Sequence, residues 1–565
     1  MKTNLVPSSL LFPFFGFFMI VSCAKKKETP APPPVLTKDT SFFLVKASIN
    51  GIAVKNNTQY NIAPNPIIQL TFSAPVNTAS VSGNIALTIG STVVPLNYSY
   101  SNNDTTLIIQ PGGALQALSP YSLSILTGVK STADSALKSI IHFSLVTQID
   151  STDKFPQITD SALLTLVEQQ TFNYFWEFGH PVCGMARERT SSGDVVTTGG
   201  SGFGIMSMLV GVQRNFISRA QALSRIDTIV NFLTNTVTRY HGAFPHWING
   251  SSGATVPFSQ QDDGADIVET SYMIQGLLCA RQFFNSTTDS TEINLRTAIN
   301  NIYNGVQWNW FRQNGQDVLT WNWSPDYGWA INVQIQGWCE ALITYVLAAS
   351  SPIDSNAIPP IVYSNGWAQN GAMKNGNSYY GVALPLGPAE GGPLFFAHYS
   401  FLGINPTGLS DAYANYWVQD TAHATINYLY CVANPQGYNG YSSSCWGLTA
   451  SDIQFGYSAS SPTNDLGVIA PTAAISSIPY TPVQSLNALR FFYYKLGNKI
   501  WGPYGFYDAF DLSSVWVDTD CLAIDQGPQI VMIENYRTGL LWNLFMSCPE
   551  VKTGMKNLGF SGPNL

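Results

Sequence analysis

The sequence predicts an all-α toroid of helical hairpins preceded by a small antiparallel β-sandwich. Three observations support this fold class. The 565 residues are too many for one ordinary core, so at least two domains are expected. Short β-branched runs separated by turn residues fill 41–150, which is typical of a sandwich. From about residue 155 onward, the apolar residues instead recur at helical spacing.

The first 23 residues have the features of an export signal. Lys2 supplies a positive start, an apolar run follows, and the run ends in Ile20-Val21-Ser22-Cys23, which resembles a bacterial lipobox. We therefore expect cleavage before Cys23 and lipid attachment to it; the alternative is a plain signal peptide. The residues after Cys23 lack an acidic export cluster, so an outer-membrane lipoprotein on the periplasmic side is expected rather than one on the cell surface.

Two segments lie between the signal and the helical region. Residues 24–40 contain three consecutive prolines, which favour a stiff polyproline tether. Residues 41–150 contain alternating stretches such as "IIQLTFSAPVN", and "LTFSAPVN" and "LSPYSLSIL" resemble bacterial immunoglobulin-like domains. Because this region has no acid pair and no metal-ligand spacing, a spacer or support domain is favoured over a carbohydrate-binding module.

The helical domain is predicted to span 155–562 and to contain roughly ten to twelve helices. Thr159 and Asp160 can cap the first of them, and Ile226, Ile229 and Leu233 form one apolar stripe of another. Long Gly- and Pro-rich loops separate the helices, which favours antiparallel hairpins around a central cleft. Further helices are expected near 202–215, 264–284, 289–310, 332–349, 411–431, 464–476, 483–496 and 527–546.

The composition favours a neutral, polyhydroxylated ligand. Charged residues make up 11% of the chain and aromatic residues 13%, and the net charge is −8. A negative chain with few basic residues argues against binding nucleic acid or a polyanion. Flat rings can stack on the C–H faces of sugars, although many of them must also fill the core. No zinc, calcium or phosphate-binding motif is present in the sequence, so neither a metal nor a cofactor is expected.

An acidic cluster begins one predicted helix. In "QDDGADIVETSYMIQGL", Asp262, Asp263, Asp266 and Glu269 fall within eight residues. Acids in a first turn cap N–H groups and complement the helix dipole, and Asp263 could serve that purpose alone. Capping needs one or two acids, however, and Asp266 and Glu269 share a face at i,i+3 spacing. The surplus therefore predicts a catalytic or sugar-binding site.

Two weaker motifs lie elsewhere. "CWGLTASDIQFGY" carries Trp446 and Asp452 on an aromatic, turn-rich stretch, although an aspartate there could simply cap a turn. "CGMARERTSSGD" carries Glu188 and Arg189, whose alternating charges could form a buried ion network.

These motifs together resemble a known family. The chain is similar to the glucoamylase-like domain of bacterial lipoproteins, glycoside hydrolase family 144, the β-1,2-glucanases. The resemblance covers about 155–562 and departs from the family pattern at Ala523, where glycine is usual. It implies an (α/α)6 barrel and hydrolysis of β-1,2-glucan or sophoro-oligosaccharides with inversion at the anomeric carbon. The matching blocks are 175–190, 261–278, 393–406, 445–452, 468–482, 523–528 and 532–542.

An inverting glycosidase needs a carboxylic acid and a carboxylate base. Glu269 is the predicted acid, because its apolar neighbours Ile267 and Val268 would favour the protonated form. Asp452 is the candidate base. Sugar binding, or tuning of the Glu269 pKa, is expected of Asp263, Asp266 and Glu188. The other predicted substrate contacts are Arg189, His246, Trp247, His398, Tyr399 and Trp446.

Several alternatives remain open at this stage. The protein could cleave another glucan linkage, or it could be a non-catalytic glycan-binding lipoprotein. A polysaccharide lyase is disfavoured, because lyases neutralise a uronate carboxylate with Arg or Lys and the chain has only 26 of these. A monomer is expected. Among eight cysteines, Cys431 and Cys445 flank a turn-rich loop and form the one disulfide considered, and Glu534 and Arg537 form an expected i,i+3 salt bridge.

Overall fold

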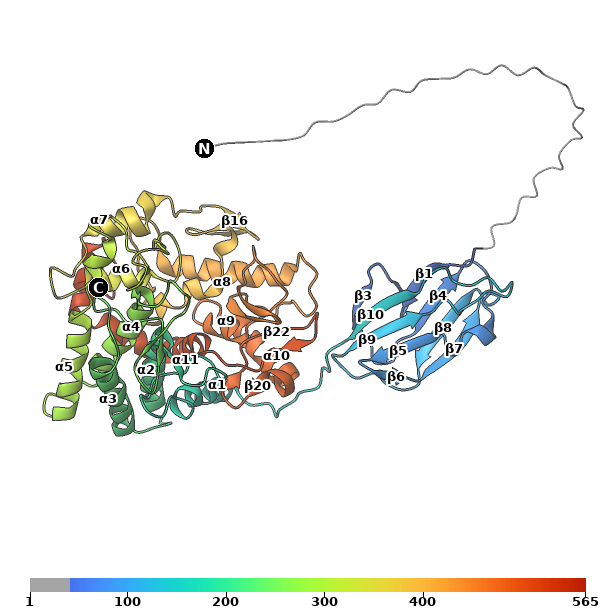
Figure 1. Cartoon of the computed structure of the whole chain (residues 1–565), viewed down its shortest axis with the longest axis horizontal. Helices are drawn as coiled ribbons and strands as arrows, with labels where there is room; N and C mark the ends of the chain where they lie inside the picture. Colours follow the sequence, from blue (N-terminus) through green and yellow to red (C-terminus); the bar gives the residue numbers. More distant parts are fainter. Residues whose placement is uncertain (1–40) are drawn as a thin grey trace, which may run out of the picture.

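The computed structural model describes residues 41–565, which form two domains (Figure 1). The predicted signal segment 1–23 with its lipid-anchor Cys23, and the predicted linker 24–40, lie outside the described residues. The first described domain consists of strands, and the second consists mainly of helices. Within 41–565, no helix combines the length and hydropathy needed to cross a bilayer.

The first domain is a β-sandwich of two five-stranded sheets, which confirms the sequence prediction. One sheet has the order β2-β1-β4-β8-β7 and the other the order β3-β10-β9-β5-β6. All pairs are antiparallel except β3 with β10. The strands are β1 Leu44–Ile49, β2 Ile52–Ala53, β3 Thr58–Ile62, β4 Ile68–Phe72, β5 Ile85–Ile89, β6 Thr92–Val94, β7 Leu96–Ser101, β8 Thr106–Pro111, β9 Pro120–Ile125 and β10 Ile141–Thr147.

The sandwich has its own hydrophobic core. In β4, Ile68, Leu70 and Phe72 are buried and alternate with half-buried polar residues, as expected for a strand with one face toward a core. Leu70 meets Leu107 of β8 on one sheet, and Leu123 of β9 closes the core from the other sheet. Leu118 packs instead with the core of the helical domain, so the two domains touch at this residue.

The second domain contains the long helices. Their bounds are α1 Asp160–Trp176, α2 Thr198–Gln213, α3 Arg219–Asn235, α4 Ile267–Phe283, α5 Ser290–Asn304, α6 Leu342–Ala349, α7 Pro360–Val362, α8 Tyr416–Ala433, α9 Pro471–Ser476, α10 Pro482–Ile500, α11 Ala523–Thr538, α12 Leu540–Met546 and α13 Pro549–Asn557. Short helical turns lie at Trp308–Arg312, Tyr363–Trp367, Gln369–Gly371, Ala389–Gly391, Leu394–Ala397 and Ser400–Leu402.

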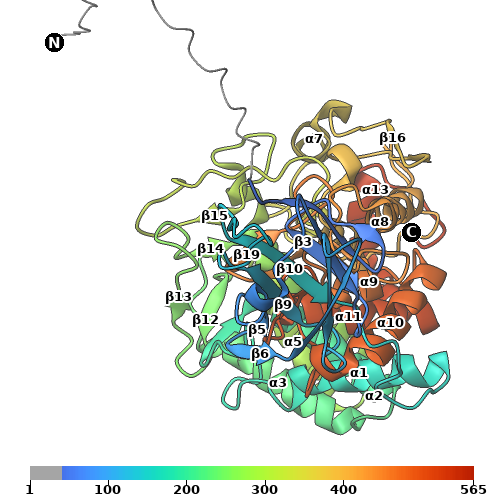
Figure 2. The same ribbon diagram turned by 90° about the vertical axis from the view of Figure 1, so that its right-hand side faces the viewer.

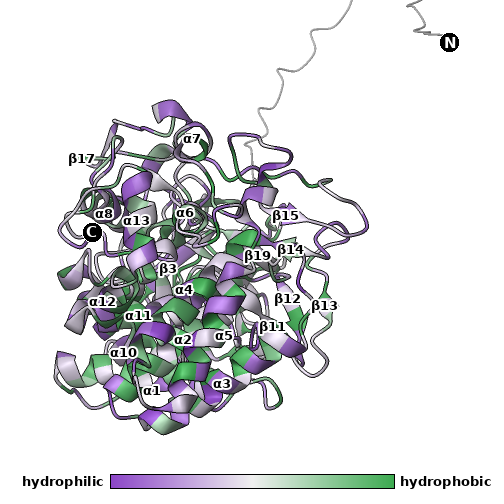
Figure 3. Ribbon diagram, turned by 90° about the vertical axis from the view of Figure 1, so that its left-hand side faces the viewer, coloured by the Kyte–Doolittle hydropathy of each residue, from purple (hydrophilic) through white to green (hydrophobic). Residues whose placement is uncertain are grey.

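The helices differ in how they are buried. Nearly every residue of α2, α4 and α11 is buried, and α2 packs against both α4 and α11. Gly202 and Gly276 allow the backbones of α2 and α4 to approach, because a Cβ at either position would overlap the other helix. By contrast, α3 and α5 bury one face only and carry both hydrophilic and hydrophobic residues (Figure 3). An inner set of helices is thus covered by an outer set.

Four predicted helices are shorter than expected. The segment 464–476 is helical only over Pro471–Ser476. The segment 332–349 becomes helical only at Leu342, because Gly337 has a φ of +72°, which the α-helix does not allow. The segment 527–546 divides at Gly539, whose φ of +70° ends α11 before α12 begins. The segment 289–310 leaves the α-helix after Asn304.

Small β-ladders lie in the connections between the helices, and several of them can be followed in Figure 2. The ladders near the site are β11 Val195–Thr197 with β12 Trp247–Asn249 and β13 Thr255–Val256, β14 Ala265–Asp266 with β15 Asn322–Trp323, and β18 Ala450–Ile453 with β19 Gly456–Ala459. The remaining ladders are β16 Ser378–Tyr379 with β17 Val382–Ala383, β20 Trp501–Gly502 with β21 Gly505–Phe506, and β22 Phe510–Asp511 with β23 Trp516–Val517.

Two predicted pairings are wrong. Cys431 and Cys445 are both free and buried, so they do not form the disulfide considered from their loop spacing. Glu534 pairs with Arg214 at 2.6 Å rather than with Arg537, and Arg537 pairs with Glu168 at 2.6 Å. Glu534 and Arg537 have the right spacing along α11 to pair with each other. Each instead pairs with an oppositely charged residue from a neighbouring helix: Arg214 at the end of α2 and Glu168 of α1.

Candidate active site

A cavity of about 360 Å³ lies in the helical domain, where the small β-ladders meet α2, α4 and α11. Aromatic rings form much of its wall and carboxylic acids line part of it. No residue of the long segment 353–392 is among those lining it. The lining residues are Glu188, Arg189, Thr197, His246, Trp247, Phe258, Glu269, Tyr272, Trp321, Glu340, Phe395, Tyr399, Ala450, Tyr457, Leu522 and Ile524.

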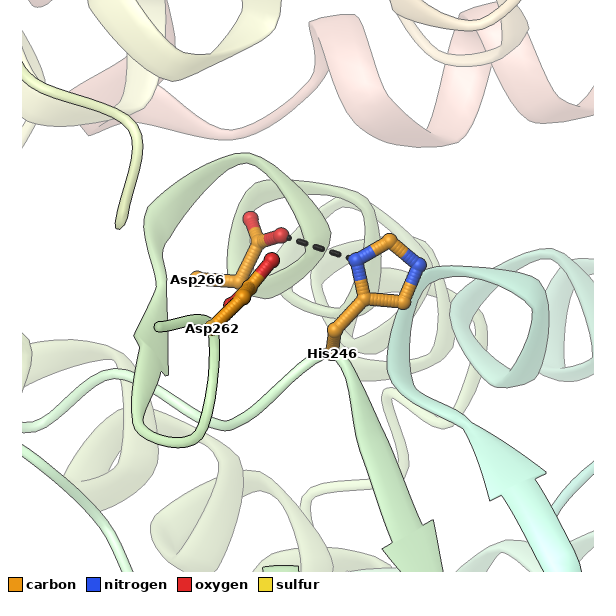
Figure 4. Close-up of side chains that lie close together, drawn as sticks. All are labelled: His246, Asp262 and Asp266. Atoms are coloured by element: carbon orange, nitrogen blue, oxygen red, sulfur yellow. Dashed lines mark hydrogen bonds and ion pairs between the residues drawn. The ribbon is translucent and has the colours of Figure 1, made fainter. Parts of the chain in front are cut away.

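Asp266, rather than Asp263, caps the helix that carries the acidic cluster. One oxygen of Asp266 accepts hydrogen bonds from the backbone N–H groups of Val268 and Glu269, both at 2.9 Å. Its other oxygen accepts from Nδ1 of His246 at 3.0 Å (Figure 4) and from Nε1 of Trp321 at 3.2 Å. Asp266 is fully buried and is not among the lining residues, so it positions its neighbours from behind the cavity wall.

Glu269 follows three residues later in the first turn of α4 and reaches the cavity. Its Oε2 accepts a hydrogen bond from the N–H of Gly199 at 2.6 Å, and its Oε1 lies 4.0 Å from Nε2 of His246. A Cβ at position 199 would lie 2.6 Å from Oε2, so the glycine leaves room for the carboxyl. Burial, opposed by His246 and aided by Asp266, raises the pKa of Glu269 to about 7.

His246 lies between two carboxyls. Burial alone would lower the pKa of its imidazole, but Glu269 and Asp266 outweigh this effect and raise the pKa to about 9. His246 also stacks on Phe258, with ring centroids 4.4 Å apart. Asp262 completes this side: it accepts from Asn322 at 3.0 Å, and burial together with Asp266 raises its pKa to about 6.

Asp452 lies on the other side of the cavity, in an ion pair. Nη1 of Arg189 donates to both of its oxygens, at 3.0 and 2.8 Å, while Nε of Arg189 donates to Glu188. Asp452 does not itself line the cavity, although Ala450 and Tyr457 of the same hairpin do. The distant motifs around 188 and 452 are therefore brought together, as the site hypothesis required.

Further acids gather behind Asp452. The backbone N–H of Asp452 donates to Asp508 at 2.7 Å. Burial raises the pKa of Asp508, that of Asp525 to about 7 and that of Asp518 to about 6. One oxygen of each of these three carboxyls is buried without a hydrogen-bond partner. The raised pKa values mean that some of these carboxyls stay protonated, which reduces the repulsion among several acids clustered around one arginine.

Within 41–565, two groups of side chains have an arrangement that could hold a metal ion: His246 with Asp262 and Asp266 (Figure 4), and Asp452 with Asp508 and Asp518. In the first group, Asp266 already accepts from four donors at 3.2 Å or less. In the second, the Arg189 guanidinium occupies both oxygens of Asp452. In both groups, donors from the protein itself therefore already hydrogen-bond the carboxylates that a metal ion would bind.

The structure separates the predicted sugar contacts into two sets. Glu188, Arg189, His246, Trp247 and Tyr399 line the cavity, as expected of substrate contacts. Asp263 is half-buried and does not line it, and one of its oxygens has no hydrogen-bond partner among the described residues.

Two predicted sugar contacts are wrong, because both side chains belong to the core. Trp446 is fully buried and its indole N–H donates to the carbonyl of Gln484 at 3.4 Å. His398 is buried, contacts Ser477 at 3.0 Å, and has a pKa lowered to about 3 by that burial and by His423.

Sequence reasoning missed several lining residues, of which Glu340 is chemically the most important. Burial raises the pKa of this carboxylic acid to about 7, and Glu269 contributes to the shift. Glu340 is a single acid in "GWCEALITY", without a second acid nearby to draw attention to it. Phe258, Tyr272, Trp321 and Tyr457 were also missed, because exposure of an aromatic ring toward a cavity has no local sequence signal.

The fold and the cavity define a class: a helical domain with an acid-bearing, aromatic-lined cavity, preceded by an immunoglobulin-like sandwich. Family comparison agrees, with residues 332–549 matching the family described as "Putative glucoamylase" and residues 48–147 matching the bacterial Ig-like domain.

The relatives identify the family. An endo-β-1,2-glucanase from Chitinophaga pinensis, solved with sophorotriose and glucose, is 49% identical, with a TM-score of 0.70 over 72% of this chain and 100% of its own. A β-1,2-glucanase from Parabacteroides distasonis is 36% identical, with a TM-score of 0.69 over 92% of this chain and 73% of its own. The protein therefore belongs to the glucoamylase-like family of these β-1,2-glucanases, which resembles glycoside hydrolase family 144 as the sequence predicted.

A curated relative has a narrower description. The exo β-1,2-glucooligosaccharide sophorohydrolase (non-reducing end) of Parabacteroides distasonis is 44% identical over 423 residues, which are 71% of this chain. The match spans 58% of that relative's length.

Proposed function

We propose that this protein is a glycoside hydrolase that cleaves β-1,2-glucan or sophoro-oligosaccharides by an inverting acid/base mechanism in an (α/α)6 barrel. The observation that carries the proposal is Glu269, a carboxyl with a pKa near 7 in an aromatic-walled cavity. Relatives described as β-1,2-glucanases support the substrate. The inner and outer helices support the barrel.

Each carboxyl has a proposed step. Glu269 protonates the glycosidic oxygen of the leaving group, which is possible because its acid form persists to about pH 7. Asp452 accepts a proton from water, and that water attacks the anomeric carbon from the opposite face. The C–O bond to the leaving group breaks as the new one forms, so the β-linkage yields an α-hemiacetal. Glu188, Arg189, His246, Trp247 and Tyr399 would hold the sugars.

Glu340 is the alternative acid, because it lines the same cavity with a similarly raised pKa. Asp525 is the alternative base, because it lies in the acid cluster next to Asp452 and Arg189. Variants decide between the members of each pair.

The test is incubation of the chain starting after Cys23 with linear β-1,2-glucan, with products followed by proton NMR from the first minutes. Early α-anomeric reducing ends are expected from the wild type; early β-anomers would contradict inversion. Product length would separate endo from exo attack. Binding without cleavage would favour a glycan-binding protein, and cleavage of other glucans alone would reassign the linkage.

Variants assign the roles in the same assay. Glu269→Gln should lose nearly all activity while keeping its fold and its affinity for oligosaccharide, and activity above a few per cent would move the acid role to Glu340. Asp452→Asn should be severely impaired. A fully active Asp452→Asn variant would place the base elsewhere, with Asp525 the next residue to replace.

We also propose that Cys23 is lipidated and holds the protein, as a monomer, at the periplasmic side of the outer membrane. The Ile20-Val21-Ser22-Cys23 pattern supports the anchor. Cys23→Ala should move the protein from the membrane fraction to the soluble fraction, and an unchanged distribution would contradict lipidation.

A further inference from the structure

Exposed aromatic side chains gather beside the cavity. After residue 155, the described chain has six exposed Phe, Tyr or Trp side chains, and four of them lie on three segments, two of which contribute residues to the cavity wall. These four are Phe258, Tyr327, Phe455 and Tyr457. Phe455 is the extreme case, with 90% of its surface exposed. A single exposed apolar residue needs no explanation, but a group beside a cavity marks a binding surface.

The hairpin that carries Phe455 is held firmly at its base. Asp452 pairs with Tyr457 and Ile453 with Gly456, which leaves Gln454 and Phe455 as the turn. The Asp452 carboxylate is held by Arg189, and its N–H donates to Asp508. The turn therefore projects Phe455 from an anchored ladder, two residues from the cavity-lining Tyr457.

The other two rings lie on two further segments that a hydrogen bond connects. Phe258 lines the cavity, stacks on His246 and is 50% exposed. Gln260, two residues on, donates to the hydroxyl of Tyr327 at 3.1 Å. Phe258 and Tyr457 both line the cavity, and each is 50% exposed. The cavity is thus bordered by exposed aromatic rings from two distant parts of the chain.

The size of the cavity requires that a polymeric substrate continues beyond it. About 360 Å³ is at the low end of the roughly 300–1,000 Å³ of small-ligand pockets. A glucan chain bound at Glu269 must therefore leave over the rim. Aromatic rings offer flat apolar faces to the C–H faces of glucosyl units at little entropic cost.

We propose that the rim aromatics form an outer subsite for glucosyl units beyond the cavity, with Phe455 as its main platform, so that the subsite sets a preference for longer chains. This inference rests on the proposed function of the same site. It assigns Phe455 to substrate binding and gives it no part in proton transfer, so its removal should weaken binding of long substrates and leave the chemical step intact.

The test compares wild type, Phe455→Ala, Phe455→Trp and the control Phe43→Ala, which removes a half-exposed ring on the sandwich. KM and kcat are measured for a β-1,2-linked trisaccharide and for long β-1,2-glucan. Phe455→Ala should raise the KM for the long glucan about 3- to 10-fold, the range expected for loss of one ring contact, with kcat and the trisaccharide KM unchanged. Phe455→Trp should retain wild-type values.

Two results would overturn the inference: an unchanged KM for every chain length, or an equal rise for the trisaccharide, which would place Phe455 in the inner site. Retardation in native gels containing long β-1,2-glucan gives a readout that does not need turnover. Equal retardation of wild type and Phe455→Ala would also overturn it. A wild type that cleaves nothing would contradict the proposed function, whereas the gel comparison would still decide the role of Phe455.

Discussion

At the scale of single residues, the proton affinity of Glu269 is set by burial and two charged neighbours. Burial raises the pKa, His246 lowers it and Asp266 raises it, with a result near 7. Because the folded pKa lies above the ordinary 4.5, protonation of Glu269 stabilises the fold below pH 4.5, and this contribution is lost as pH rises through about 7. His246 behaves similarly between its ordinary 6.5 and about 9. Both groups therefore make the helical domain less stable in alkali.

Opposite substitutions around Glu269 should move the pH profile in opposite directions. If Glu269 is the acid, kcat/KM falls above about pH 7. His246→Gln removes a positive neighbour, so this alkaline limb should move to higher pH. Asp266→Asn keeps an oxygen for the helix cap but removes a negative charge, so the limb should move to lower pH. Profiles of kcat/KM from pH 4 to 10 measure both shifts. If the two variants shift the alkaline limb in the same direction, the limb does not report the titration of Glu269.

The sequence could predict part of this site. The cluster contains more acids than helix capping needs, and this excess led to Glu269, which lines the cavity. The same cluster also contains the helix cap, which is Asp266 and not the expected Asp263. Glu340 could not be found in this way, because it reaches the cavity through tertiary packing alone. Trp446 and His398 failed for the converse reason: their neighbours in sequence suggest a site, but their side chains face the core.

At the scale of elements, four charged side chains join three helical segments. Glu168 of α1 and Glu534 of α11 are fully buried, and Arg214, at the end of α2, lies between them. Arg537 of α11 donates to Glu168. Burial raises the pKa of Glu168 to about 7 despite both arginines, so its charge depends on these partners.

Removing one arginine should therefore be costly. Arg537→Ala leaves Glu168 buried with a single, longer contact to Arg214 at 3.6 Å, and should lower the free energy of unfolding by about 3–5 kcal/mol. Arg490→Ala is the matched control, because its ion pair with Asp160 is half-exposed and should contribute no more than about 1 kcal/mol. Denaturant unfolding followed by tryptophan fluorescence compares the two variants. Equal losses would contradict the role of burial.

Helix positions followed from the sequence better than helix ends. The apolar stripe of α3 is buried as predicted, at Ile226, Ile229 and Leu233. The late start of α6 and the early end of α11 come from backbone conformation at Gly337 and Gly539, where a positive φ interrupts an otherwise helical pattern. A glycine in a sequence does not reveal whether its φ is positive, so such breaks are visible only in the fold.

At the scale of the whole molecule, the two domains have separate cores that touch at Leu118. The sandwich contributes no residue to the cavity. Its stability and the proposed hydrolysis should therefore be independent properties.

Calorimetry should show two unfolding transitions. Leu123→Ala, at a fully buried position of the sandwich, should destabilise only that domain by about 2–5 kcal/mol and leave hydrolysis at 25 °C unchanged. Leu277→Ala, fully buried in α4, should shift the other transition, and activity should be lost along with it. A common shift of both transitions in either variant would show that the domains unfold as one unit.

The seven cysteines within 41–565 are all free, and six of them are buried. Burial raises the pKa of every one of these thiols, to about 11 for Cys183 and about 12 for Cys548, so the native protein presents little thiolate to an oxidant. In an oxidising compartment, an unfolded molecule exposes these thiols, and random disulfide formation then prevents it from refolding. For a protein exported as proposed above, the working lifetime is then governed by the rate of unfolding, which depends on the height of the unfolding barrier rather than on the equilibrium stability.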